Sequence, residues 1–218
     1  MRPAPLLAGA AVALLALAAC NKDADQTNAP SAVTNAEANA TPSANPASTL
    51  LSTTDVTTAA NFVTLAAASD MFEIQSSKIA LQRSTNPDVK RFAQMMIDAH
   101  TKTTTTLKGL VAAQSNLTLP TGLPSDLQSK LDQLGSVSSA DFDQAYLNDQ
   151  VDGHQSALNV MQRYAKDGDT EPLKQFAAAT APTVQQHLDK AKALLAALSH
   201  AGTNSATNAA SNTATNSP

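Results

Sequence analysis

Four side chains that can bind a metal ion or share a proton interrupt the apolar helical faces of this 218-residue sequence. They are one glutamate and three histidines, namely Glu73, His100, His154 and His187. At about 100° per residue, the neighbours of each on a helical wheel are mainly alanine, leucine, valine, phenylalanine and methionine. Each therefore falls in the middle of a stripe that should be buried, where a carboxylate or an imidazole needs a polar partner.

Two kinds of chemistry would satisfy these four groups. In the first, Glu73 accepts hydrogen bonds from one or more histidines, and the cluster is a polar core that fixes the register of the helices. In the second, three neutral imidazoles and one carboxylate bind a transition-metal ion, and Zn, Cu, Ni or Fe would accept such ligands. The hydrogen-bonded core is the commoner arrangement for histidines inside helical proteins, so it is the first hypothesis and the metal site is the alternative.

The spacing of the acidic residues argues against chemistry with two iron ions. Di-iron carboxylate proteins use several glutamates and a Glu-x-x-His spacing on two helices. Here the residues three positions before the histidines are Ile97, Val151 and Val184. We therefore expect at most one metal ion and no iron storage. The sequence also lacks a glycine-rich phosphate loop and a Cys-x-x-Cys pair, which favours a protein without catalytic activity.

Four long helical patterns must position the polar residues. They cover approximately residues 58–84, 86–115, 138–166 and 171–198. Asn86, Pro87 and Asp88 supply a cap residue, a proline suited to the first turn and an acid that is favourable at a helix N-terminus. Counted from the intervening turns at about 1.5 Å per residue, the four polar residues lie near mid-length of their helices and would meet at one height.

The lengths of the connections indicate how the helices are arranged. Two connections are short and should join antiparallel neighbours, whereas residues 116–137 form a long connection that includes one short helix after Pro124. A long crossover between the second and third helices is typical of ferritin-like bundles. We therefore predict an all-α fold, a ferritin-like four-helix bundle, over residues 58–200.

The N-terminal residues have the features of a lipoprotein signal peptide. Arg2 precedes an apolar run at residues 6–19, and Cys20 follows a run of small residues that is typical of a lipobox. Cys20, the sole cysteine, would then be lipidated and become the first residue of the mature protein. Asn21, in place of an aspartate, favours the outer membrane over the inner membrane. Residues 21–57 and 201–218 are polar and lack an apolar period, and we interpret them as a disordered tether and tail.

The charge of the chain limits the partners that can be expected. The net charge is −4 and no basic block is present, so the sequence does not suggest a nucleic-acid partner. The expected partner is a membrane, reached through the N-terminal lipid. The sequence identifies no protein partner.

Four segments around the polar residues are similar to a known bacterial family. They are FEIQSSKIALQRS, NPDVKRFAQMMIDAHTK, DFDQAYLNDQVDGHQSAL and APTVQQHLDKAKAL. Together they resemble exported ferritin-like domains of unknown function, found in outer-membrane or periplasmic proteins. The resemblance implies a ferritin-like bundle in the cell envelope and implies no activity. Members commonly carry an acid immediately before the second- and third-helix histidines, but this chain has Ala99 and Gly153 there, so its imidazoles need another orienting group or have none.

These observations lead to two functional hypotheses. The first is a lipid-anchored protein of the cell envelope whose helical domain is a binding or interaction module with a polar Glu/His centre. The alternative is a mononuclear metal-binding protein, redox-active or metal-buffering, with Glu73, His100, His154 and His187 as ligands.

Overall fold

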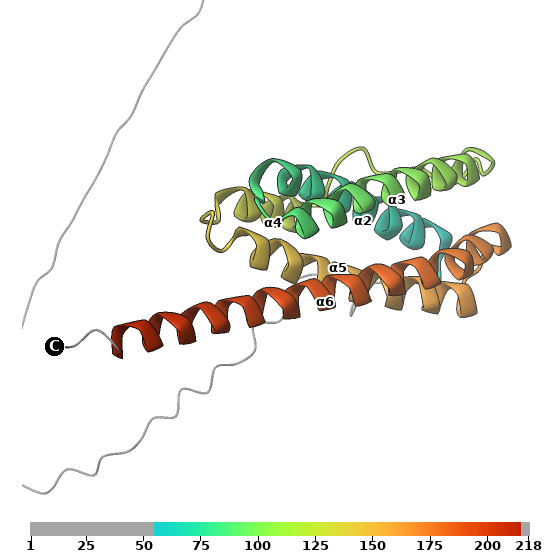
Figure 1. The fold of residues 1–218 in the computed structure, drawn as a ribbon. Coiled ribbons are helices and arrows are strands. Elements are labelled where there is room, and N and C mark those ends of the chain that lie inside the picture. Colours follow the sequence, from blue (N-terminus) through green and yellow to red (C-terminus); the bar gives the residue numbers. More distant parts are fainter. Residues whose placement is uncertain (1–54, 215–218) are drawn as a thin grey trace, which may run out of the picture. The chain divides into compact units, whose positions relative to one another are not determined.

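The computed structural model describes the backbone of residues 55–214 and the side chains of residues 55–200. This part of the chain contains five α-helices and no strand (Figure 1). They are α2 (Ala59–Arg83), α3 (Pro87–Ala112), α4 (Ser125–Ser136), α5 (Phe142–Asp167) and α6 (Glu171–Ala214). The predicted all-helical fold is confirmed for these residues. The predicted signal peptide with Cys20, and the predicted tether up to residue 54, lie outside the described residues.

The ends of the helices follow the local chemistry of the sequence. The Asn86 side chain accepts a hydrogen bond of 2.9 Å from the backbone of Asp88, and α3 begins at Pro87, as expected. Helix α5 begins at Phe142, a few residues later than predicted, because the Ser138 hydroxyl and the Asp141 carboxylate, 2.6 Å apart, close a turn before it. The last helix continues to Ala214, past the predicted end near residue 198.

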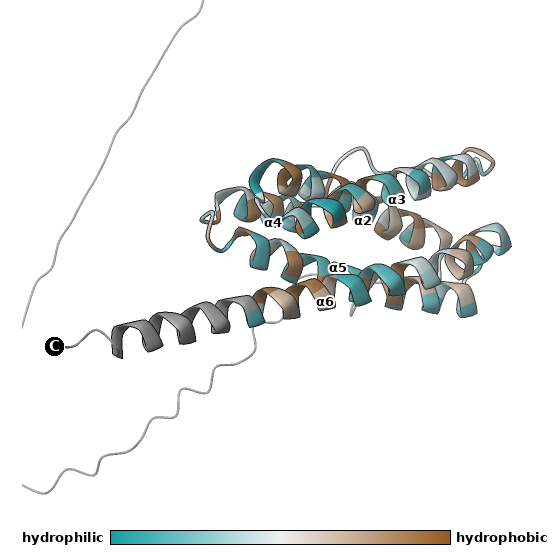
Figure 2. Cartoon of the chain, in the orientation of Figure 1, coloured by the Kyte–Doolittle hydropathy of each residue, from teal (hydrophilic) through white to brown (hydrophobic). Residues whose placement is uncertain are grey.

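The long helices pack as two hairpins. Helix α2 packs along α3, and α5 packs along α6 (Figure 1). The two hairpins meet where α2 contacts α5 and where α3 contacts α6, and α4 packs against α2 and α5. Figure 2 shows that each long helix carries both hydrophobic and hydrophilic residues, as helices that bury one face do.

The buried core consists of two apolar clusters. One includes Phe62, Tyr164 and Phe176, and the other includes Phe92, Phe142 and Tyr146. Buried polar residues lie between these clusters along the helices: Asp70, Glu73, Ser76, Ser77, His100, Gln150, His154 and His187. The interruption of the apolar stripes that the sequence predicts near mid-length is therefore present in the fold.

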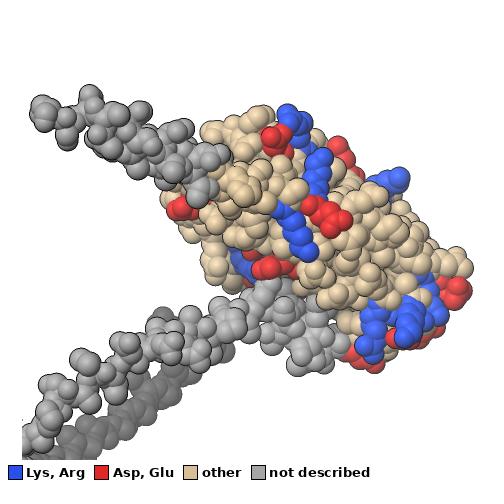
Figure 3. All heavy atoms as spheres, turned by 60° about the horizontal axis from the view of Figure 1, so that its bottom comes forward, with Lys and Arg blue, Asp and Glu red and all other residues tan. Residues whose placement is uncertain are grey.

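The outer surface carries charges of both signs. Lysine, arginine, aspartate and glutamate side chains are interspersed on the face shown in Figure 3, and much of this face carries neither sign. Among the described residues, no helix combines the length and the apolar character needed to cross a membrane.

Candidate metal centre

Three histidines from three helices meet between the apolar clusters. His100 of α3, His154 of α5 and His187 of α6 are all buried. Their ring centroids are 5.6 Å apart for His100 and His154, 5.8 Å for His100 and His187, and 5.4 Å for His154 and His187. Their candidate ligand nitrogens all lie within 4.8 Å of one another.

This spacing is close to what a metal ion requires. A point equidistant from three nitrogens 4.8 Å apart is roughly 2.8 Å from each, whereas a zinc–nitrogen bond is about 2.0–2.1 Å long. Inward shifts of roughly 0.7 Å per ring would therefore suffice for an ion to bind all three nitrogens.

Hydrogen bonds determine which ring nitrogens are available. His100 Nδ1 lies 2.8 Å from Asp70 Oδ1, and His154 Nδ1 lies 2.8 Å from the backbone oxygen of Gln150. A carboxylate and a carbonyl can only accept, so Nδ1 carries the hydrogen in both rings, and in a neutral ring Nε2 then keeps its lone pair. His100 Nε2, His154 Nε2 and His187 Nδ1 are buried and have no hydrogen-bond partner among the described residues.

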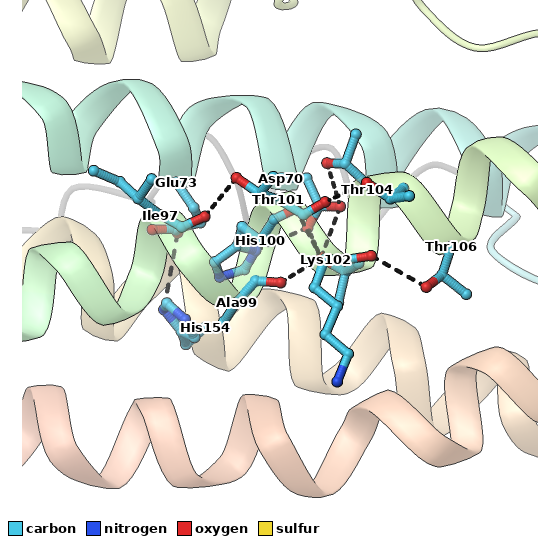
Figure 4. Close-up of polar contacts among 12 residues, drawn as sticks. Asp70, Glu73, Ile97, Ala99, His100, Thr101, Lys102, Thr104, Thr106 and His154 are labelled. Carbon is cyan, nitrogen blue, oxygen red and sulfur yellow. Dashed lines mark hydrogen bonds and ion pairs between the residues drawn. The ribbon is translucent and has the colours of Figure 1, made fainter.

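Asp70 of α2 is a residue of the candidate site that the sequence analysis missed. It is 7% exposed and accepts hydrogen bonds from His100 and from the Thr103 and Thr104 hydroxyls, at distances between 2.8 and 3.0 Å (Figure 4). A carboxylate on the far nitrogen fixes the tautomer and the direction of a metal-binding imidazole. Asp70 thus provides, from a neighbouring helix, the acid that the sequence lacks at Ala99. The feature of the sequence that could have identified Asp70 is its position three residues before Glu73, on the same face of the helix.

His154 is oriented by its own helix. The backbone oxygen of Gln150, one turn earlier in α5, accepts a hydrogen bond from its Nδ1. Gly153, which stands where an acid was expected, faces Glu73, because a Cβ atom there would lie 3.0 Å from Glu73 Oε1. The glycine therefore leaves room for the glutamate between α2 and α5.

Glu73 lies beside this group of nitrogens. It is 1% exposed, and its Oε1 is 3.8 Å from His154 Nδ1, the nitrogen that is already bonded to Gln150. Its Oε2 has no hydrogen-bond partner among the described residues. The structure brings the three predicted histidines together with their lone pairs available, and a role for Glu73 as a fourth ligand stays a prediction.

Burial controls the ionisation of these groups. Desolvation, together with the charge of His100, lowers the pKa of His154 to about 3 and that of His187 to about 4. Desolvation also lowers the pKa of His100, but the hydrogen bond to Asp70 and the charges of Glu73 and Asp70 outweigh it, so its pKa is raised. Desolvation raises the pKa of Glu73 to about 7, and the charge of His100 opposes this only in part. Two of the three imidazoles are thus neutral at neutral pH, which is the form that binds metals.

A cleft connects the histidines to the surface. It has a volume of about 450 Å³, and residues of all four long helices line it. His100 and His187 form part of its wall, with hydroxyl groups from Thr103 and Thr180. Lys102 also lines the cleft and extends away from the histidines in Figure 4. The cleft therefore brings solvent to the rings of His100 and His187, whose partnerless nitrogens are themselves buried.

Comparison with protein families agrees with the sequence analysis on the class of protein. The model described as "Domain of unknown function (DUF4142)" matches residues 40–194. The chain belongs to the DUF4142 family. The expectation of a helical family without an assigned activity is thereby confirmed, whereas export and attachment to the envelope stay predictions. Comparison with curated protein sequences finds no match.

Two solved structures resemble this DUF4142 protein in fold. "CopM in the Cu(II)-bound form" has a TM-score of 0.56 and 15% sequence identity, over 65% of this chain and 97% of that one. A DUF305 fragment from Deinococcus radiodurans has a TM-score of 0.50 and 12% identity, over 61% of this chain and 94% of that one. At these identities the likeness concerns the helical fold alone.

Proposed function

We propose that this DUF4142 protein binds one first-row transition-metal ion through His100, His154 and His187. The observation that carries the proposal is that three buried histidines place ligand nitrogens within 4.8 Å of one another, and that each ring has one buried nitrogen without a hydrogen-bond partner among the described residues. A buried acceptor without a partner costs about 1–3 kcal/mol, and three in one place are a large cost for a purely structural cluster. A metal ion would satisfy all three at once.

The hypothesis of a hydrogen-bonded core accounts less well for these contacts. It requires the histidines to bond to Glu73 or to one another. The nearest approach of Glu73 to His154 is 3.8 Å, which is an ion-pair distance and too long for a hydrogen bond. Asp70 and Gln150 satisfy only the Nδ1 atoms of two rings and leave the converging nitrogens free.

The properties of the donors favour Cu(II) as the ion that binds tightest. For nitrogen ligands the affinity of divalent ions rises toward Cu(II) and then falls at Zn(II). The described residues contain no cysteine that would favour a softer ion. A protein of similar fold, 15% identical in sequence, is described as Cu(II)-bound.

The fold and the location belong to the same proposal. Two helical hairpins, with α4 in the long connection between them, support a ferritin-like four-helix bundle. Lipidation of Cys20 would place this bundle on the periplasmic face of the envelope, in keeping with the outer membrane expected from Asn21. A single buried site held by histidines suits metal buffering or delivery.

Elemental analysis of the purified chain tests the proposal. After incubation with equal concentrations of Cu(II), Zn(II) and Ni(II) and removal of free metal, we expect about one equivalent, mainly copper. The double variant His100→Ala, His154→Ala should retain none, whereas His200→Ala, the matched control outside the cluster, should bind as the parent does. A folded parent that retains no metal would overturn the proposal.

A further inference from the structure

A second cavity is lined by Glu73 and by none of the three histidines. It lies between α2, α4 and α5 and has a volume of about 100 Å³. Most of its wall is apolar and includes Leu65, Phe72, Leu127 and Val160. It shares part of one wall with the cleft described above, but Glu73 lines only the cavity, and His100 and His187 line only the cleft.

Glu73, which lines this apolar space, has an unsatisfied carboxyl oxygen. The side chain is 98% buried, and its Oε2 has no hydrogen-bond partner among the described residues. Gly153, which also lines the cavity, provides the room for this carboxyl, since a Cβ atom would come within 3.0 Å of its other oxygen. A buried carboxyl oxygen without a partner is unfavourable, so a molecule that brings a hydrogen-bonding group to it would bind with added affinity.

Two charged residues of the cavity wall compensate each other. Lys130 and Asp149 both line the cavity, and their charged atoms are 2.9 Å apart. Their side chains are only 17% and 20% exposed, so each charge is directed at the other. This compensation gives no advantage to an anion or a cation and favours a neutral ligand.

Size and polarity define the class of ligand. An apolar cavity of about 150 Å³ can hold benzene, so a six-membered ring would fill this cavity of about 100 Å³ and extend into its opening, and nothing larger would fit. A hydroxyl group both donates and accepts, so it can satisfy Glu73 Oε2 whether or not the carboxyl carries a proton. We propose that this cavity binds a small neutral molecule with an apolar body and one hydroxyl, such as a phenol, with the hydroxyl on Glu73. The proposal does not depend on the metal site.

Binding of phenol and of toluene, which has the same shape without the hydroxyl, provides the test. Both are titrated into the full chain after treatment with a chelator, so that phenol cannot bind through a metal ion, and affinity is measured by calorimetry or ligand-observed NMR. We expect phenol to bind about tenfold more tightly than toluene in the parent chain, because one hydrogen bond to Glu73 is gained.

Three variants separate this cavity from other sites. Glu73→Leu should abolish the preference for phenol over toluene, and Ala68→Leu, which fills the cavity from α2, should abolish binding of both. Lys102→Ala, which changes the cleft but not the cavity, should bind both as the parent does. Phenol binding that persists in a folded Ala68→Leu variant would overturn the proposal, as would the absence of phenol binding in the parent, which would mean that water alone occupies the cavity.

Discussion

His100 Nδ1 lies 2.8 Å from Asp70 Oδ1, across the interface between α3 and α2. The Thr103 and Thr104 hydroxyls of α3 both lie 3.0 Å from Asp70 Oδ2 as donors, and the Thr103 hydroxyl also lies 2.9 Å from Oδ1. The carboxylate therefore has a fixed position, and it fixes the ring so that Nε2 remains free. Two adjacent helices thus share the orientation of one candidate ligand.

This contact predicts the effect of Asp70→Asn on metal affinity. An amide accepts only through its oxygen and carries no charge, so it holds the Nδ1–H of His100 less strongly, and the threonine hydroxyls must turn to accept from its nitrogen. We expect copper affinity to fall about 10- to 100-fold in competition titrations, as for other changes behind a metal ligand. Asp98→Asn, at an exposed acid of the same helix α3, should bind as the parent does. Equal affinities for the two variants would show that Asp70 does not position the ligand.

The position of Gly153 predicts that replacing this glycine with alanine does not give the gain in stability that is usual inside a helix. Inside a helix this change normally stabilises by up to about 1 kcal/mol. At Gly109 of α3 a new Cβ would meet nothing within 4 Å, so Gly109→Ala should show this gain. At Gly153 the Cβ would meet Glu73 Oε1 at 3.0 Å, and we expect Gly153→Ala to be about 1–2 kcal/mol less stable than Gly109→Ala. Urea unfolding of the metal-free proteins measures the difference, and similar gains for both would show that Glu73 moves away freely.

The sequence predicts both the helices and the positions of the three histidines on them, because both depend on residue spacing alone. Helical phase and distance from a turn are fixed by the number of residues, so His100, His154 and His187 could be assigned to one face and one height. The partnership of Asp70 and His100 was not predictable in this way, because it depends on how α2 and α3 are rotated against each other.

The surroundings of Glu73 show the same limit. Its phase on the helix predicted burial, which the structure confirms. Its contacts depend on the missing side chain at Gly153 and on α4, which covers the second cavity. A helix in a long connection has no fixed position relative to residue number, so the sequence could not indicate which groups would surround this carboxyl.

The shifted pKa values predict how acid affects the metal-free protein. His154 and His187 have ordinary values of 6.5 that fall to about 3 and about 4 on folding. Below pH 6.5 the unfolded chain therefore binds more protons at these sites, and stability falls as the pH falls. The pKa of Glu73 rises from 4.5 to about 7 on folding and that of His100 is also raised, so protonation of these two residues opposes the loss. We expect a net loss of stability from pH 6.5 to pH 4.5, measured as the midpoint of urea unfolding.

The variant Glu73→Gln measures how much the Glu73 carboxyl reduces the loss of stability on acidification. Without the carboxyl, nothing at this position offsets the two histidines, so the loss of stability on acidification should be steeper than in the parent. The difference in slope can reach about 1.4 kcal/mol per pH unit for a single proton. An unchanged slope would show that the carboxyl keeps its ordinary pKa in the folded protein.

The cleft between solvent and the histidines predicts a kinetic effect at α6. Ala178 and Ala179 are adjacent and both exposed, but only Ala179 lines the cleft. Ala179→Trp should therefore obstruct the approach to His100 and His187 and slow copper uptake in stopped-flow measurements at least severalfold, whereas Ala178→Trp should not. Affinity at equilibrium should be the same in both variants, because neither tryptophan contacts the ligand nitrogens and a route that is narrowed slows release as well as uptake. Equal uptake rates in the two variants would show that the ion enters elsewhere, for example through a transient separation of α5 and α6.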